Sequence, residues 1–275
     1  MINIEKAVVK APAASIYAEP SISAEMADEV LHGMSVEILL KIGEFNKIKT
    51  HYDYEGYIHN TYLSSQNPGL WDKEEKLVVS AANADVLSKA NMKSPILTTL
   101  TKGGILAKRA IEGDFTLVHL ADGRDGYIRN KFIEEPAKDF DYKNASVKEI
   151  NGFREKLAES ALFYMGTQYR WGGKTPWGID CSGLCSMVYL LNGVVIYRDS
   201  SLKDGFPVKR ISISNLSKGD LLFFPGHIAL YLEDGRYIHS SIANDGVAIN
   251  SLFSHHDDFN KKLSESIINC GSIFA

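Results

Sequence analysis

QYRWGGKTPWGIDCSGLC, residues 168–185, carries the clearest functional signal in the chain. A loop rich in glycine, proline and tryptophan leads to Cys181, which stands between Asp180 and the pair Ser182-Gly183. The apolar run that follows predicts a short buried helix ending at Asn192-Gly193. A cysteine at the start of a helix meets the positive end of the helix dipole, which favours the thiolate that attacks carbonyls. Cys181 is therefore a candidate nucleophile, and the alternative is a small, inert core residue.

Two histidines downstream of this segment lie in successive strand-like runs. His227 begins HIALYL after the turn Pro225-Gly226, and His239 lies in RYIHSS after a hairpin turn at 233–235. Adjacent antiparallel strands would bring the two rings together. A nucleophile, a base and a third polar group that orients the base form the general arrangement for covalent catalysis. The pattern therefore favours a cysteine-dependent catalytic site.

From about residue 147 to the C-terminus the chain resembles the NlpC-type cell-wall cysteine peptidases, which have a compact papain-like α+β fold. The motifs that carry the resemblance are YRWGG (169–173), DCSG (180–183), YRDS (197–200), KGDLLFF (218–224), GHIALYL (226–232) and YIHSS (237–241). The resemblance implies that Cys181 is the nucleophile, His227 the general base and His239 the polar residue that orients the base. The oxyanion would be bound by the backbone N–H of Cys181 and, as the resemblance implies, by the hydroxyl of Tyr169. Aromatic packing beside Trp171 is the alternative role for Tyr169.

The same resemblance assigns part of a substrate site. Asp180 and Ser182 flank the nucleophile and would recognise the L-alanine end of a murein peptide, and Asp180 could at the same time cap the helix. Asp199 and Ser200 match the pair that lies near the γ-D-glutamyl unit in the family. For this pair, an ordinary polar turn is the alternative.

The first 135 residues contain an internal repeat at an offset of 70, in which Gly33, Phe45 and Tyr57-Ile58 match Gly103, Phe115 and Tyr127-Ile128. Each copy has short apolar runs with a period of two between glycine turns, the pattern of a small antiparallel barrel. The ending GxYI resembles bacterial SH3-like domains. We expect two all-β SH3-like barrels, at 1–66 and 77–135, joined by a polar linker and followed by the peptidase domain at 147–275. Binding to the wall and packing against the peptidase are the alternatives for their role.

Differences between the two copies point to residues of the first barrel that do more than fold. Tyr54 matches Arg124, and Glu25 matches Pro95. In family members that cleave stem peptides with a free N-terminal L-alanine, the first SH3-like domain walls off the groove and supplies an acid and a tyrosine for the α-ammonium. The resemblance makes Tyr54 the expected tyrosine and Glu25 the expected acid, with Asp28 next. Functionally neutral variation of surface residues between the two copies is the alternative.

A helix is predicted directly before the candidate catalytic segment. Ser146 and Glu149 form a capping box. Apolar residues then recur at helical spacing until Gly166, namely Ile150, Phe153, Leu157, Ala161 and Tyr164.

Composition limits the class of protein. With 275 residues, 45% hydrophobic and 23% charged, the chain is an ordinary soluble globular protein with room for two or three domains. A net charge of −4 gives no sign of the basic surface that binds nucleic acid, so we expect no nucleic-acid partner. The longest apolar stretches are too short and too interrupted to span a bilayer. We expect a monomer that is cytoplasmic as given, or periplasmic or extracellular if a signal was removed.

A structural zinc site is the main competitor to catalysis. Cys181 and Cys185 lie one helical turn apart, and two thiolates with two imidazoles would suit zinc. The wide spacing and the apolar neighbours of Cys185 argue against it, and three scattered cysteines argue against a disulfide framework. We therefore expect no metal and no cofactor. The remaining histidines, at positions 32, 51, 59, 119, 255 and 256, are expected to be solvated surface residues.

The resemblance implies a cysteine peptidase of the γ-D-glutamyl-L-diamino acid endopeptidase type. Its expected substrates are murein tripeptides or tetrapeptides with a free N-terminal L-alanine, cleaved during recycling or turnover of the cell wall. The third residue could be diaminopimelate or lysine. The alternative is a wall-binding protein whose peptidase domain is inactive or regulatory, and a further possibility is an amidase or acyltransferase on the same scaffold.

Overall fold

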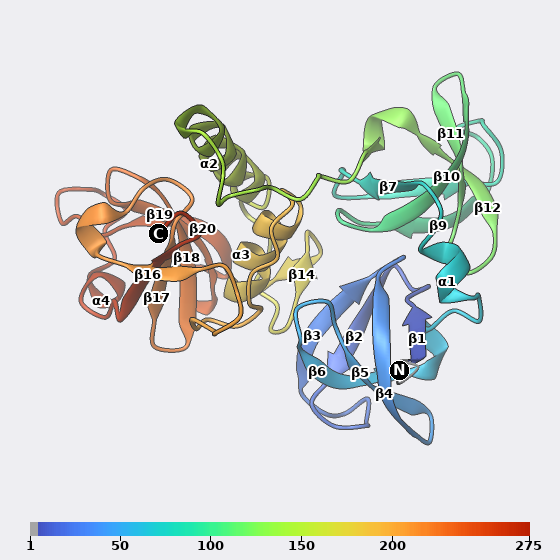
Figure 1. The fold of residues 1–275 in the computed structure, drawn as a ribbon, viewed down its shortest axis with the longest axis horizontal. Helices are drawn as coiled ribbons and strands as arrows, with labels where there is room; N and C mark the ends of the chain where they lie inside the picture. Colours follow the sequence, from blue (N-terminus) through green and yellow to red (C-terminus); the bar gives the residue numbers. More distant parts are fainter. Residues whose placement is uncertain (1–4) are drawn as a thin grey trace. The chain divides into compact units, whose positions relative to one another are not determined.

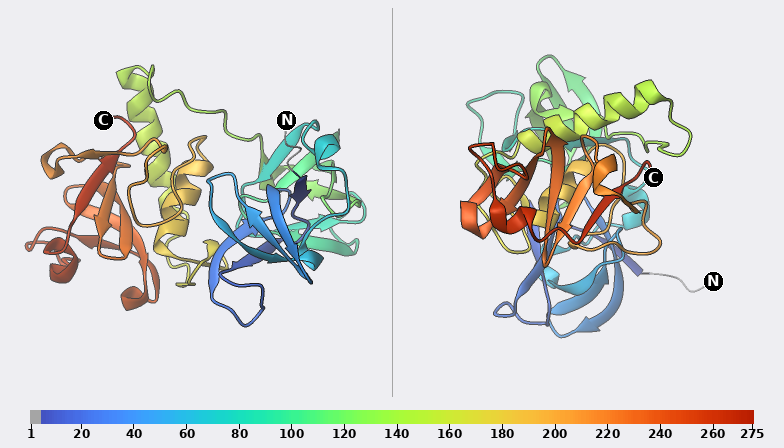
Figure 2. Two further views of the ribbon diagram at one scale, coloured as in Figure 1. Left: turned by 60° about the horizontal axis from the view of Figure 1, so that its bottom comes forward. Right: turned by 90° about the vertical axis from the view of Figure 1, so that its left-hand side faces the viewer.

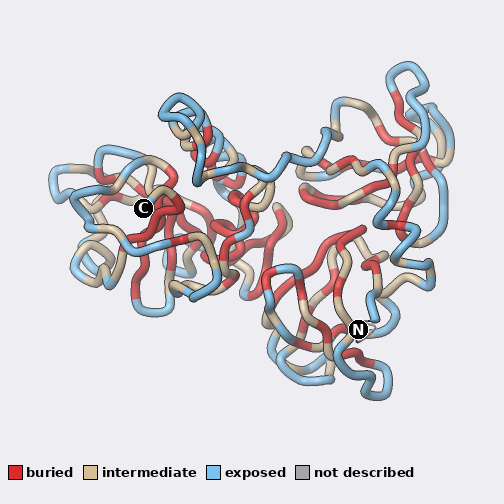
Figure 3. The backbone as a smooth tube through the Cα atoms, in the orientation of Figure 1, coloured by how far each residue is buried: buried red, intermediate tan, exposed pale blue. Residues whose placement is uncertain are grey.

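The structure, a computed structural model, describes residues 5–275. The chain divides into two compact units, one that ends at Pro136 and one from Ala137 to Ala275 (Figure 1). Most of the buried backbone lies in the strands of the sheets and in one helix of the second unit, whereas the turns are exposed (Figure 3). The described residues contain both sheets and helices, which agrees with the α+β class expected for the chain.

The first unit begins with a six-stranded antiparallel sheet. Its strands are β1 (Glu5–Val8), β2 (Ala13–Tyr17), β3 (Met26–Leu31), β4 (Ser35–Ile42), β5 (Phe45–Lys49) and β6 (Glu55–His59), in the order β1-β4-β5-β6-β2-β3. Alternate residues of these strands point inward and form a small core around Ile16, Val30, Ile48 and Ile58. The period of two in the sequence thus arises because one face of each strand is buried.

A second sheet follows with the same arrangement. Its strands are β7 (Lys76–Val79), β8 (Ala84–Leu87), β9 (Ile96–Leu100), β10 (Ile105–Glu112), β11 (Phe115–His119), β12 (Asp125–Arg129) and β13 (Ile133–Glu134), in the order β13-β7-β10-β11-β12-β8-β9. Apart from β13, this order repeats that of the first sheet. The bulge in β4 between Ile38 and Leu40 also recurs in β10, between Lys108 and Ala110. The sequence repeat and the structural repeat therefore share one offset.

The segment between the two sheets is more than a polar linker. It contains the short helix α1 (Pro68–Trp71), and the side chain of Trp71 is buried. The indole Nε1 of Trp71 donates to the carbonyl of Gly33, in the turn between β3 and β4, at 2.9 Å. A Cβ on Gly33 would come within 2.3 Å of the Ile105 carbonyl oxygen, and Gly33 has φ +78°, so only glycine fits this contact.

His32 corrects one expectation, because it is buried rather than solvated, with 1% of its surface exposed. Its Nδ1 lies 2.8 Å from the carbonyl of Lys10, and its Nε2 accepts from the backbone N–H of Ala121, in the second sheet, at 3.1 Å. The ring therefore joins the two sheets through backbone groups. Of the other five, His51 and His255 are exposed, whereas His59, His119 and His256 are partly buried.

The second unit packs helices against a six-stranded antiparallel sheet. Its helices are α2 (Val147–Leu162), α3 (Cys181–Leu190) and α4 (Lys261–Ser264), and the hairpin β14 (Lys174–Thr175) and β15 (Gly178–Ile179) precedes α3. The sheet strands are β16 (Lys209–Ile211), β17 (Leu221–Phe224), β18 (His227–Glu233), β19 (Arg236–Ser241), β20 (Gly246–Ser251) and β21 (Asn269–Ser272), in the order β16-β21-β17-β18-β19-β20. The capping box predicted at Ser146 and Glu149 is present at the start of α2 and is confirmed.

Helix α3 lies at the centre of this unit. It contacts β18 and β19 on the sheet, and α2 packs beside it (Figure 2). One core cluster joins Leu157 of α2, Leu184 and Val188 of α3, and Ile228 and Ile238 of the sheet. Because every residue from Cys181 to Tyr189 is buried, the start of α3 is held rigidly against the strands that carry the two histidines.

Candidate active site

Cys181 is the first residue of α3, and Asp180 is its N-cap. The backbone of Asp180 is extended, and its carboxylate accepts from the N–H of Gly183 at 2.6 Å. A Cβ on Gly183 would lie 2.1 Å from a carbonyl oxygen of the preceding loop, so glycine is needed for this close approach. The loop is tied to β19, because Ser240 Oγ donates to the carbonyl of Ile179 at 2.7 Å. Together these contacts fix the position of the cysteine.

The environment of the Cys181 thiol differs from the expectation of a resting thiolate. Burial, and next the negative charge of Asp180, raise the pKa of Cys181 to about 11. The backbone N–H groups of Ile228 and Ser182 are directed at the sulfur and oppose that rise. The helix dipole is therefore outweighed by desolvation and the adjacent carboxylate. At neutral pH Cys181 is therefore a thiol. It lies next to the backbone of Ile228, the residue that follows His227.

The side chains of His227 and His239 lie next to each other, as predicted from their positions on adjacent strands. His227 begins β18 directly after the turn at Gly226, and His239 lies on the neighbouring strand β19. His227 Nε2 lies 2.7 Å from His239 Nδ1, within hydrogen-bond distance. Burial, and next the charge of His239, lower the pKa of His227 to about 4, and burial also lowers the pKa of His239. Both rings are therefore neutral at neutral pH and can accept a proton.

The chain of contacts continues to a residue that sequence reasoning missed. The other ring nitrogen of His239, Nε2, lies 2.9 Å from Oδ1 of Asn250 on β20. Asn250 stands opposite Tyr237 in the β19–β20 ladder, two places from the partner of His239. Such a diagonal neighbour is within reach of long side chains. A single asparagine in a strand carries no distinctive sequence signal.

Asp180 and Ser182 form a buried polar cluster with Arg198, a residue of the YRDS motif to which no role was assigned. Arg198 is 1% exposed, and its guanidinium donates to both carboxylate oxygens of Asp180, at 3.1 and 2.9 Å. It also donates to Ser182 Oγ at 2.5 Å. Gly172 N–H donates to the same carboxylate at 2.8 Å. The charge of Asp180 is therefore balanced inside the cluster, which stiffens the loop that presents Cys181.

Tyr169 lies beside the same segment. It bridges to Ile179, and its N–H donates to the carbonyl of Asp245 at 3.0 Å. Burial, and next the negative charges of Cys181 and Asp180, raise the pKa of the Tyr169 hydroxyl to about 12. The phenol therefore stays protonated and can donate a hydrogen bond near the sulfur.

Asp199 and Ser200 follow Arg198 in an irregular bend and are partly buried. Asp199 is hydrogen-bonded to the hydroxyl of Tyr197, whose pKa is raised by burial and next by this carboxylate. The pair therefore belongs to the loop that the buried Arg198 anchors.

The residues expected from the first barrel lie in the other unit. Tyr54 is partly buried directly before β6, and Glu25 is exposed directly before β3. Asp28, the second choice for the acid, is fully buried on β3 and accepts a hydrogen bond from the hydroxyl of Tyr52. The rings of Tyr52 and Tyr54 have their centroids 6.5 Å apart. Asp28 therefore shares a tyrosine cluster with the expected tyrosine.

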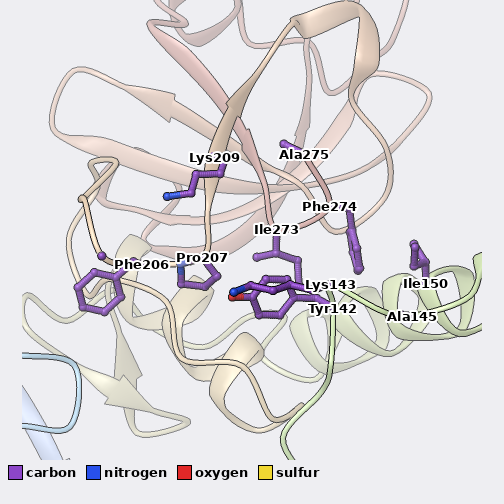
Figure 4. A pocket seen from close by; sticks show the side chains of 11 residues that line it. Tyr142, Lys143, Ala145, Ile150, Phe206, Pro207, Lys209, Ile273, Phe274 and Ala275 are labelled. Atoms are coloured by element: carbon purple, nitrogen blue, oxygen red, sulfur yellow. The ribbon is translucent and has the colours of Figure 1, made fainter.

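The second unit also contains a cavity of about 600 Å³ (Figure 4). Tyr142, Phe206, Pro207 and Phe274 line it, with two lysines. None of the candidate catalytic residues contributes to its wall.

Among residues 5–275, no group of three or more His, Cys, Asp or Glu side chains is arranged to hold a metal ion. In the same part of the chain, no helix is both long and apolar enough to cross a membrane.

Two family profiles match parts of this chain. The profile of the NlpC/P60 family matches residues 166–263, and that of the bacterial SH3 domain matches residues 12–64. The first of these segments contains Cys181, His227 and His239. The second covers most of the first sheet.

Known proteins resemble the chain over different lengths. It is 40% identical to "Dipeptidyl-peptidase 6" of Lysinibacillus sphaericus, over 98% of this chain and 99% of that protein. It is 31% identical to "Gamma-D-glutamyl-L-lysine dipeptidyl-peptidase" of Bacillus subtilis, over 38% of each. A crystal structure of an NlpC/P60 family protein from Bacillus cereus superposes with a TM-score of 0.80 at 20% identity, covering 98% of this chain and 100% of that one. This last likeness is one of fold.

Proposed function

The chain belongs to the NlpC/P60 family, and from this premise we propose that it is a cysteine peptidase that hydrolyses peptidoglycan peptides. The bond cleaved is that between the γ-D-glutamyl residue and the diamino acid of a murein stem peptide. The observation that carries the proposal is the 2.7 Å contact between His227 and His239, on the strands that pack against the helix bearing Cys181. The 40% identity to a dipeptidyl-peptidase, over 98% of this chain, supports the same chemistry.

The reaction begins from a neutral pair. Since Nε2 of His227 faces His239, its Nδ1 is the nitrogen left to take the proton of the Cys181 thiol. Proton transfer accompanies attack of the sulfur on the amide carbonyl, and the resulting imidazolium then protonates the leaving amine. The Tyr169 hydroxyl and the Cys181 backbone N–H stabilise the oxyanion. Water then hydrolyses the thioester, with His227 as the base.

Recognition of a free N-terminal L-alanine is assigned to charged and hydroxyl groups. Asp180 and Ser182 border that end of the peptide on the catalytic unit, where Arg198 holds both side chains in place, and Asp199 and Ser200 hold the γ-D-glutamyl unit. Tyr54 and an acid of the first barrel, Glu25 or Asp28, bind the ammonium. Glu25 is exposed and so open to a ligand, whereas Asp28 is fully buried and accepts a hydrogen bond from Tyr52. An acetylated amine carries no charge, which would leave the acid unpaired.

The domain organisation belongs to the same proposal. The shared strand order and bulge positions support two SH3-like barrels, at 1–66 and 77–135, before a peptidase domain at 147–275. The protein would act as a monomer without a cofactor, in recycling or turnover of wall peptides.

Hydrolysis of defined peptides tests this function. The protein is incubated with L-Ala-γ-D-Glu-diaminopimelate, with its lysine analogue and with the N-acetylated forms, and products are identified by mass spectrometry. We expect release of the L-Ala-D-Glu dipeptide from the free-amine peptides alone, and none from the Cys181→Ala variant. Cleavage of acetylated peptides would indicate a looser endopeptidase. No cleavage by the intact protein would favour the inactive, wall-binding alternative.

A further inference from the structure

We propose that Asn250 is a positioning residue that determines where the protons lie on both histidines of the active site. The inference rests on the proposed function, because it concerns how His227 becomes a base. It follows from the contacts at both ends of the Asn250 amide. These contacts favour one arrangement of donors and acceptors along the series of hydrogen bonds from Asp258 through Asn250 and His239 to His227.

The orientation of the Asn250 amide is fixed first. Its Nδ2 donates to the backbone carbonyl of Asp258 at 3.2 Å, and a carbonyl can only accept. Its Oδ1 therefore faces the other way, 2.9 Å from Nε2 of His239. Asn244 Nδ2 donates to the same oxygen at 3.0 Å. A flipped amide would set oxygen against the Asp258 carbonyl and nitrogen against the donor of Asn244.

The amide orientation then determines the tautomer of each ring. Oδ1 of Asn250, 2.9 Å from Nε2 of His239, can only accept, whereas Asn244 Nδ2 lies farther from that ring nitrogen, at 3.2 Å, and already donates to the same oxygen at 3.0 Å. Nε2 of His239 therefore carries the proton, and Nδ1 of the neutral ring is bare. A bare Nδ1 accepts, so His227 must present a protonated Nε2 across the 2.7 Å contact. In a neutral imidazole one nitrogen is a donor and the other an acceptor. Nδ1 of His227 is thus left with a free lone pair, which is the form required of the base for Cys181.

The carbonyl that starts this chain is itself held firmly. The Ser251 N–H donates to the same Asp258 oxygen at 2.8 Å. The carboxylate of Asp258 accepts from Nε of Arg236 on β19 at 3.2 Å, and Asn260 N–H donates back to Ser251 at 3.0 Å. The segment after β20 is therefore fastened on both sides of Asp258. A rigid carbonyl can impose its polarity on the amide.

The test compares Asn250→Ala with Asn244→Ala. Both asparagine side chains lie within hydrogen-bond distance of Nε2 of His239, but only Asn250 offers this nitrogen an acceptor. We expect Asn250→Ala to lower kcat by about ten- to a hundredfold with KM within about twofold, the range for removing a group that orients a reacting ligand from outside. Asn244→Ala removes only a second donor to the Asn250 oxygen, because the Asp258 carbonyl still orients the amide, so it should lower kcat less than Asn250→Ala does. Nitrogen-15 NMR of the histidine rings should report a single tautomer at His239 in the parent and in Asn244→Ala, and a mixture in Asn250→Ala.

A third variant distinguishes a positioning role of Asn250 from a purely structural one. Asn250→Asp keeps an acceptor opposite His239 and adds a negative charge, so we expect it to retain the tautomer and more activity than Asn250→Ala. As the pH is lowered, kcat/KM of Asn250→Asp should begin to fall at a higher pH than that of the parent, because the carboxylate favours the protonated rings. Unchanged ring spectra in Asn250→Ala, or equal losses in Asn250→Ala and Asn244→Ala, would overturn the proposal. If the parent cleaves no peptide, the proposed function fails, whereas the spectra still decide the role of Asn250.

Discussion

Two histidines of this protein are buried to the same extent and are used differently. His32 in the first unit and His239 in the second are each 1% exposed, and both ring nitrogens of each are within hydrogen-bond distance of a partner. His32 lies between two backbone groups, the carbonyl of Lys10 and the N–H of Ala121. His239 lies between two side chains, those of His227 and Asn250. The kind of partner, not the degree of burial, distinguishes a structural histidine from a candidate catalytic one.

The two rings also hold opposite tautomers. A carbonyl requires a proton on Nδ1 of His32, and an N–H group requires a bare Nε2. Backbone amides neither take nor release protons near neutral pH, so nothing can follow from this pair of bonds except adhesion between the two sheets. In His239 the proton sits on Nε2, and the bare Nδ1 faces a ring that can itself titrate. Only the second arrangement can pass a change of charge to a neighbour.

The largest expected effect separates the two histidines by activity. His239→Ala should lower kcat/KM on L-Ala-γ-D-Glu-diaminopimelate by about 10³- to 10⁴-fold, because the base loses the group that holds its tautomer. His32→Ala is the matched control and should stay within about threefold of the parent. Steady-state kinetics with the same peptide measure both. Equal losses would mean that burial alone, and not the side-chain partner, makes a histidine important for catalysis.

A smaller effect separates them by stability. His32→Ala leaves the carbonyl of Lys10 and the N–H of Ala121 buried without a partner, and each such group costs about 1–3 kcal/mol. We expect faster hydrogen exchange at the amide of Ala121 and a free energy of unfolding of the first unit lower by about 2–4 kcal/mol. His239→Ala should leave exchange at Ala121 unchanged. Amide exchange followed by mass spectrometry or NMR tests this, and unaltered exchange in His32→Ala would contradict the bridging role.

Local patterns in the sequence predicted most of the fold. The capping box at Ser146, the helix that begins at Cys181 and the paired strands carrying His227 and His239 all depend on short-range spacing. Because the repeat places equivalent residues 70 positions apart, the shared strand order of the two sheets also had a visible signal.

The errors and omissions concern contacts between distant residues. His32 was expected at the surface because its partners are backbone groups 22 and 89 positions away, which leave no mark on residue types. The thiolate expectation for Cys181 failed because burial and Asp180 outweigh the helix dipole, and burial depends on packing. Asn250 and Arg198 were missed for the same reason, since each gains its importance only from the partner it meets.

The smallest effect is a difference in pH dependence between the two sites. Burial lowers the pKa of His32 below its ordinary 6.5. The hydrogen bond to the Lys10 carbonyl and the charge of Asp122 oppose this shift, and the charge of Arg124 adds to it. The unfolded chain therefore binds a proton before the folded one, so the stability from His32 is complete above about pH 6.5 and declines as the pH falls toward the folded pKa. His227, with a pKa lowered to about 4, should stay neutral through that window.

As the pH falls from 7 to 5, we therefore expect exchange at Ala121, corrected for the intrinsic rate, to rise while kcat/KM stays nearly constant. His32→Gln, which cannot titrate, is the control and should show no such rise. If kcat/KM instead fell in step with the loosening at Ala121, the base would have an ordinary histidine pKa. The desolvation that distinguishes His227 in this fold would then not govern its proton.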